Sequence, residues 1–85
     1  MIYVYKVQHL GRDKEYEGME GVRVTCLKTK VVERSFIPST DWFSGWDWQT
    51  AQKNAIERTM NEDASKLEFV CAMGDRTYVY AIQRD

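Results

Sequence analysis

The sequence has few of the residues that build metal sites, disulfides and linkers: one histidine, two cysteines and one proline in 85 residues. With His9 as the single imidazole, no histidine-based metal site is available. Cys26 and Cys71 are far apart in the sequence and form no CxxC motif. A single disulfide between them is possible, but the lack of a secretory signal favours a reduced protein in the cytoplasm. With so few prolines and only five glycines, we expect residues 1–85 to form a single domain.

Long hydrophobic runs and an excess of either charge are also absent. A run of about 18 apolar residues is needed to cross a membrane, and none approaches that length. The first ten residues are too polar for a secretory signal. The net charge of −1, from 12 basic and 13 acidic residues, does not suggest strong attraction to nucleic acid or to anionic lipid. The sequence therefore predicts no membrane association, and nucleic acid is a less favoured partner than protein.

Stretches rich in β-branched and aromatic residues predict five strands, over residues 2–8, 22–28, 31–37, 66–73 and 76–83. The first is apolar on both faces at its start, which predicts a central position in the sheet. Residues 9–21 carry three glycines and six charges and are expected to form a mobile surface loop.

One helix is predicted between the third and fourth strands. It starts near Asp47, whose carboxylate can cap the first turn, and extends to residue 64. Its apolar residues recur at helical spacing along one stripe: Trp48, Ala51, Ala55, Ile56 and Met60. The predicted fold is α+β, in the order β-β-β-α-β-β. It is a small, mostly antiparallel sheet of four to five strands with one amphipathic helix packed on one face.

The last two strands are predicted to form a hairpin around the two-residue loop Gly74-Asp75. This loop sets the register, placing Met73 opposite Arg76, Cys71 opposite Tyr78, Phe69 opposite Tyr80 and Leu67 opposite Ile82. All the large apolar groups then share one face. Both cysteines are therefore expected in the core, as inert packing.

A catalytic arrangement is not evident. No phosphate-binding glycine loop and no nucleophile elbow occurs. His9 is expected on the surface at a strand end, and Glu62 and Asp63 at a solvated helix end. We expect no enzyme, no metal and no cofactor. An enzyme that uses Cys26 or Cys71 would require a thiol that reacts rapidly at neutral pH.

The stretch DWFSGWDWQ, residues 41–49, holds all three tryptophans. Trp48 lies on the helical stripe and is expected in the core. Exposed tryptophan beside carboxylates is typical of a protein-binding hot spot, although the cluster could instead form a small core under its loop. The predicted partner-binding residues are Asp41, Trp42, Phe43 and Trp46, together with Glu15 and Glu17 of the acidic loop. The carboxylates would steer the protein toward a basic surface.

The leading hypothesis is a small non-enzymatic protein-binding module that inhibits or adapts another protein. Small chains without motifs are frequent among phage and mobile-element accessory proteins. The alternative is binding of single-stranded nucleic acid through four sheet tyrosines, Tyr3, Tyr5, Tyr78 and Tyr80. The predicted hairpin register, however, places two of these tyrosines under the helix. A homodimer through an edge strand, 31–37 or 76–84, is a further expectation.

Overall fold

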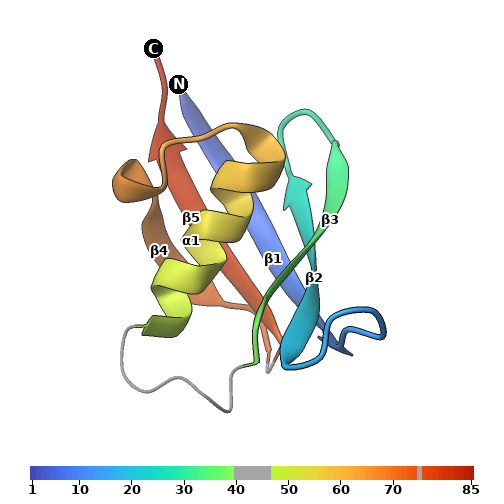
Figure 1. Cartoon of the computed structure of the whole chain (residues 1–85). Coiled ribbons are helices and arrows are strands. Elements are labelled where there is room, and N and C mark those ends of the chain that lie inside the picture. Colours follow the sequence, from blue (N-terminus) through green and yellow to red (C-terminus); the bar gives the residue numbers. More distant parts are fainter. Residues whose placement is uncertain (40–46, 75) are drawn as a thin grey trace.

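A computed structural model describes residues 1–39, 47–74 and 76–85, and it shows one antiparallel sheet with a helix across it (Figure 1). The elements are β1 (Ile2–Arg12), β2 (Met19–Cys26), β3 (Val32–Pro38), α1 (Asp47–Met60), the 3₁₀ turn η2 (Ala64–Lys66), β4 (Glu68–Ala72) and β5 (Thr77–Gln83). The strand order is β3-β2-β1-β5-β4. The predicted α+β class and the element order β-β-β-α-β-β are confirmed.

Strand β1 is the centre of the sheet, as predicted, and pairs with β2 on one side and β5 on the other. It continues to Arg12, past its predicted end, so the loop before β2 shrinks to residues 13–18. Because β5 is enclosed between β1 and β4, the prediction that residues 76–84 form an edge strand is wrong. The edges are β3, as predicted, and β4.

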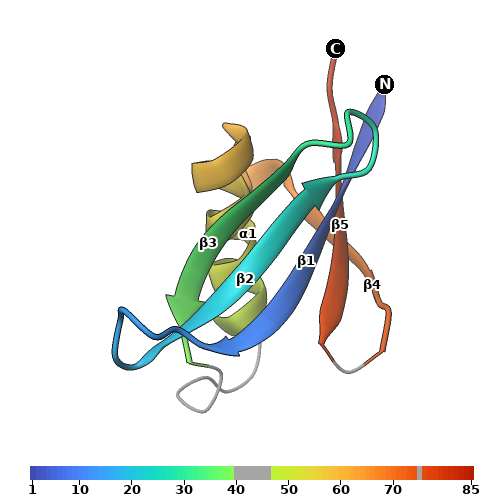
Figure 2. The ribbon, with the colours of Figure 1, turned by 90° about the vertical axis from the view of Figure 1, so that its right-hand side faces the viewer.

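The helix covers one face of the sheet only (Figure 2). Its residues Ala51, Ala55 and Ile56 are buried, and they share one core with inward side chains of β1, β2, β3 and β5. The core contains Tyr5, Val7, Val22, Val24, Cys26, Ile37, Leu67, Tyr80 and Ile82 together with these helix residues. Trp48 also lies on this side, with its ring centroid 5.5 Å from that of Phe69. We call the covered side of the sheet the inner face and the other side the outer face.

The helix ends four residues earlier than predicted. It stops at Met60, and Asn61 takes a left-handed conformation with φ 57°. The Asn61 amide donates to the carbonyl of Glu57 at 2.9 Å, which is a frequent way to end a helix. The chain then turns back, and the Asp63 carboxylate caps η2 by accepting from the Ser65 amide at 3.0 Å. The side chain of Asp47, which was predicted to cap the first turn, lies outside the part of the chain that the structure describes.

The last hairpin confirms one predicted pair and corrects two others. Phe69 is opposite Tyr80, as expected, but Cys71 is opposite Val79 and not Tyr78. The Met73 amide donates to the Thr77 carbonyl at 2.7 Å, so Met73 is not opposite Arg76. The turn is one residue longer than predicted, and a β-bulge between Phe69 and Cys71 restores the register beyond it.

The bulge turns Cys71 outward, and the prediction that both cysteines are buried is wrong for this one. Cys71 is exposed and Cys26 is buried, and both are free thiols. Burial acts to raise the pKa of Cys26, but hydrogen bonds from Thr29 and the Lys28 backbone outweigh it, so the pKa is lowered. Solvent access therefore favours reaction at Cys71, whereas the lowered pKa favours reaction at Cys26.

Access is expected to decide thiol reactivity. Wild-type protein should release about one equivalent of thionitrobenzoate rapidly from Ellman's reagent at neutral pH, and the second only after unfolding. The Cys71→Ser variant is expected to lose the rapid phase, and Cys26→Ser to keep it. A rapid phase that survives in Cys71→Ser would show that Cys26 is reached in the folded protein.

The two chain ends lie side by side at the end of the sheet opposite the 13–18 loop (Figure 1). The Met1 amino group donates to the Arg84 carbonyl, and the Arg84 amide donates to the Met1 carbonyl, both at 2.8 Å. The β1–β5 pairing thus extends to the first residue of the chain.

Candidate partner-binding surface

The acidic loop, residues 13–18, is closed by its own hydrogen bonds. The Asp13 carboxylate accepts from the amides of Glu15 at 2.8 Å and Tyr16 at 3.2 Å, which is the local turn that aspartate favours. The Asp13 amide donates to the Met19 carbonyl at 3.0 Å. Gly18 has φ 77°, a conformation that glycine adopts without steric cost. The loop therefore holds a defined shape between β1 and β2.

An exposed aromatic side chain sits on this loop. The ring of Tyr16 stacks on that of Phe36 in β3, with centroids 4.6 Å apart and planes 30° apart. Tyr16 is still 48% exposed. Arg58 of α1 lies 5.8 Å from the centre of the Phe36 ring and donates to the Ser35 hydroxyl at 3.1 Å and to the Phe36 carbonyl. These contacts fix the position of Phe36, and through it that of Tyr16.

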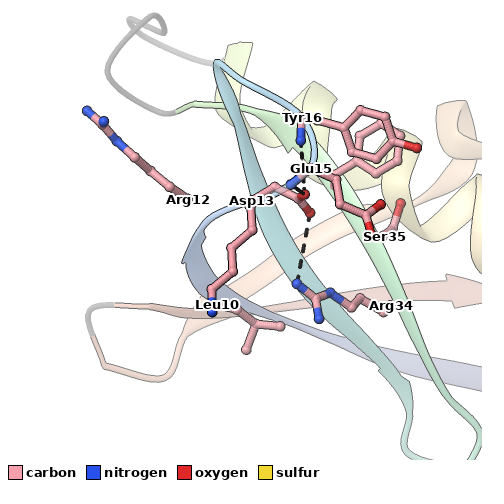
Figure 3. A pocket seen from close by; sticks show the side chains of 9 residues that line it. Leu10, Arg12, Asp13, Glu15, Tyr16, Arg34 and Ser35 are labelled. Atoms are coloured by element: carbon pink, nitrogen blue, oxygen red, sulfur yellow. Dashed lines mark hydrogen bonds and ion pairs between the residues drawn. The ribbon is translucent and has the colours of Figure 1, made fainter.

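The loop and β3 enclose a shallow depression of about 570 Å³ (Figure 3). Its lining mixes cationic and anionic side chains with apolar ones: Leu10, Arg12, Asp13, Lys14, Glu15, Tyr16, Arg34, Ser35 and Phe36. Arg34 lies 3.9 Å from the Asp13 carboxylate, and both carboxylate oxygens of Asp13 thus have partners. Glu15 contributes a carboxylate without a described ion pair to this depression.

A second depression of about 650 Å³ adjoins the same loop and shares residues 12–15 with the first. Its other lining residues are Glu17, Gly18, Met19 and Ser39. Here the Ser39 amide donates to the Gly18 carbonyl at 3.0 Å. Ser39 is the last residue before the segment 40–46. The acidic loop is therefore hydrogen-bonded to the residue from which the tryptophan-bearing segment starts.

The predicted site residues fall into two groups. Glu15 and Glu17 are exposed on the acidic loop, where the sequence placed them. Asp41, Trp42, Phe43 and Trp46 lie outside the described residues. The Ser39–Gly18 hydrogen bond connects the acidic loop to the last described residue before the second group.

The four tyrosines of the nucleic-acid alternative belong to the inner face. Tyr5 and Tyr80 are buried in the core, and Tyr3 and Tyr78 are partly buried against it. Burial under α1 leaves Tyr5 and Tyr80 no open ring face for a base. The raised pKa values of both phenols have burial as their first cause, followed at Tyr5 by the Glu62 carboxylate and at Tyr80 by Tyr78.

The predictions from sequence did not include a hydrogen-bonded chain of buried polar side chains on the inner face. His9, expected on the surface, is buried because β1 runs on past it. Its Nδ1 lies 2.8 Å from a Glu20 oxygen, and its Nε2 lies 2.6 Å from the amide nitrogen of Gln52. The Tyr80 hydroxyl donates to the Gln52 carbonyl oxygen. An amide nitrogen can only donate, so Nε2 of His9 accepts and the ring proton is on Nδ1, facing Glu20.

Glu62 is a second correction, since it was expected at a solvated helix end and is buried. The turn at Asn61 carries it back over the core, where it accepts from the Tyr5 hydroxyl. Arg84 lies 3.5 Å from the same carboxylate. A buried carboxylate needs such partners, and here they come from the first strand and from the C-terminal end of the chain.

Among the described residues, no group of three or more His, Cys, Asp or Glu side chains is arranged to hold a metal ion. Within the same part of the chain, no helix is long and apolar enough to cross a membrane. Comparison with protein-family models, curated proteins and solved structures found no match to this chain. The surface formed by residues 13–18 and Phe36, which we call the loop surface, is thus assessed on its own geometry.

Proposed function

We propose that this protein is a non-enzymatic binding module that acts in the cytoplasm by occupying a surface of another protein, as an inhibitor or adaptor. The observation that carries the proposal is Tyr16, which is 48% exposed yet held against Phe36. Tyrosine anchors of this kind supply large contact area at low entropic cost. Glu15 and Glu17, exposed on either side of it, would meet cationic groups of the partner.

The closed shape of the acidic loop supports this role. Ordering a loop on binding lowers affinity, and a loop already held by hydrogen bonds avoids much of that cost. Asp13 supplies two of these bonds to the loop amides, while Glu15 and Glu17 remain available. Exposed charges at the rim of an interface mainly speed association and select the partner, so a basic partner surface is the expected complement.

The tryptophan-bearing segment extends the proposed interface. Its first flanking residue, Ser39, is bonded to Gly18 of the acidic loop. Trp42, Phe43 and Trp46 are proposed as further anchors, with Asp41 adding to the acidic charge. Aromatic anchors from two neighbouring segments would give the clustered arrangement that binding hot spots usually have.

The test begins with affinity capture from nuclease-treated cytosolic lysate, followed by measurement of Kd with the captured protein. Tyr16→Ala is expected to weaken binding by at least about tenfold, the loss typical of a hot-spot residue. Glu15→Gln/Glu17→Gln should slow association and reduce its salt dependence. Trp42→Ala/Trp46→Ala should reduce capture while the far-ultraviolet circular dichroism stays unchanged.

The matched control is Glu33→Gln/Glu68→Gln. It removes the same charge from exposed positions on the two edge strands and is expected to leave Kd unchanged. If Tyr16→Ala and the tryptophan variant both bind as the wild type does while remaining folded, the loop surface is not the interface.

A further inference from the structure

The outer face of the sheet carries cations in neighbouring rows. Side chains alternate along a strand, so the residues between the buried ones point outward. These are Lys6 and Gln8 of β1, Arg23 and Thr25 of β2, and Val32 and Arg34 of β3. No described element packs on this side, since α1 lies on the inner face (Figure 2). These six side chains form a continuous open surface across three adjacent strands.

Two arginines are direct cross-strand neighbours on this surface. Arg23 is opposite Arg34 in the β2–β3 register, and Lys6 lies in the next row, opposite Thr25. Arg23 donates to the Gln8 side chain at 3.2 Å, and the Arg34 side chain is 68% exposed, with Asp13 3.9 Å away. Like charges directly opposite each other in a sheet are destabilising. Of the two arginines, Arg34 has a described carboxylate near it, whereas the described partner of Arg23 is the neutral Gln8 side chain.

The charge of this face differs from that of the whole chain. Acidic residues outnumber basic ones overall, for a net charge of −1. At the outward positions of the described registers of β1, β2, β3 and β5, however, there is no carboxylate. In β4, which lies beyond β5, Glu68 places a carboxylate at an outward position. Over β1, β2 and β3 an anionic partner would thus meet no carboxylate of the strands themselves, and the carboxylates near Arg34 belong to the acidic loop.

Exposed aliphatic side chains flank the cations. Val32 is 52% exposed and lies one row from Arg34 on β3, and Ile2 at the start of β1 is 62% exposed. Leu27 is also exposed. It lies beside Val4, since the Leu27 amide donates to the Val4 carbonyl at 2.9 Å. Apolar groups gathered beside a polar centre are typical of a protein-binding surface.

We propose that the outer face binds an acidic segment of a protein, with carboxylates on Arg23 and Arg34 and aliphatic side chains on Ile2, Leu27 and Val32. Paired guanidinium groups suit carboxylates, since each can donate two hydrogen bonds to one. Single-stranded nucleic acid is less suited, because bases stack on aromatic rings. Of the outward neighbours of the arginines in the described registers, Phe36 is the one aromatic residue, and its ring is already stacked on Tyr16. The proposal rests on the proposed protein-binding function and adds a second surface, with a partner of opposite charge.

The test uses three fluorescein-labelled probes and measures anisotropy at low salt. The first is a peptide with two central glutamates flanked by leucines, the second has glutamines in their place, and the third is a 20-nucleotide oligothymidylate. The glutamate peptide is expected to bind at least tenfold more tightly than either of the others. Arg23→Gln/Arg34→Gln should lower its affinity at least tenfold, and Val32→Ser should lower it several-fold.

The matched control is Lys53→Gln/Lys66→Gln, which removes the same charge from α1 and η2 and is expected to leave the affinity unchanged. Tyr16→Ala should also leave it unchanged, so a failure of either surface can be recognised while the other still binds. Equal binding of the two peptides, tighter binding of the oligonucleotide, or undiminished binding by the arginine variant would each overturn the proposal.

Discussion

Replacing Gln52 by alanine is expected to destabilise the protein by about 3–5 kcal/mol, because two buried polar groups lose their partner at once. Gln52 is completely buried. Its amide nitrogen donates to Nε2 of His9, and its carbonyl oxygen accepts from the Tyr80 hydroxyl. A domain of this size has a free energy of unfolding of about 5–15 kcal/mol, so the change would take a large share of it. Urea denaturation followed by circular dichroism measures the loss.

The control for this prediction is Asn54→Ala, at an exposed position on the same helix, which should change stability by less than about 1 kcal/mol. Tyr80→Phe removes the hydroxyl that Gln52→Ala leaves without an acceptor. The double variant should therefore be less destabilised than the sum of the two single ones. A loss below about 1 kcal/mol in Gln52→Ala would mean that the polar chain does not stabilise the fold.

Tyr5→Phe is expected to cost about 1.5–3 kcal/mol, the range for a hydrogen bond to a charged group. The Tyr5 hydroxyl donates to the buried Glu62 carboxylate, which would keep only Arg84 at 3.5 Å. Tyr3→Phe provides the control, since the partly buried Tyr3 ring contacts Lys28 and Arg84 through its face, and phenylalanine keeps that face. A double-mutant cycle with Glu62→Gln would isolate the coupling energy.

The same pair predicts how stability depends on pH. Burial and the neighbouring carboxylate raise the pKa of Tyr5 above its ordinary value, which is about 10 in an unfolded chain. The unfolded state therefore loses its proton first, and the stabilisation is complete below about pH 10 and declines as the pH rises above it. The decline approaches about 1.4 kcal/mol per pH unit for one such group. Tyr5→Phe should reduce this slope by the share of one group, since the Tyr80 phenol also has a raised pKa, and an unchanged slope would contradict the assignment.

Hydrophobic pattern was sufficient to predict the architecture. The stripe that includes Ala51, Ala55 and Ile56 is the buried face of α1, and the strongly apolar β1 is the central strand. These predictions succeed because periodicity reports which face is buried. The same pattern also held the signal for Gln52, which lies four residues from both Trp48 and Ile56, on the stripe itself.

The remaining features depend on single residues whose backbone departs from the regular pattern. The bulge between Phe69 and Cys71 turns one thiol outward, and the left-handed Asn61 returns Glu62 to the core. Neither is marked by glycine, and a shift of one residue exchanges the two faces of a strand. Pattern alone therefore misplaced Cys71 and Glu62, and it misplaced His9 because the true end of β1 lies beyond the predicted one.

The loop surface was predictable in composition and not in form. The exposure of Glu15 and Glu17 followed from their charge and the nearby glycines. The stack of Tyr16 on Phe36 joins residues twenty positions apart and depends on the β2–β3 register, which no turn residue in the sequence fixed. The outer-face arginines have the same origin, since only the register shows that Arg23 and Arg34 are opposite each other.

The adjoining chain ends determine how the fold would respond to a mechanical load. Met1 and Arg84 are hydrogen-bonded neighbours at the same end of the antiparallel pair β1–β5. Because the bonds of such a pair run perpendicular to the strands, a force that separates the ends would load them one after another, as in opening a zipper. The two central strands would part early, and the core with them, so pulling Met1 and Arg84 apart should unfold the domain at low force.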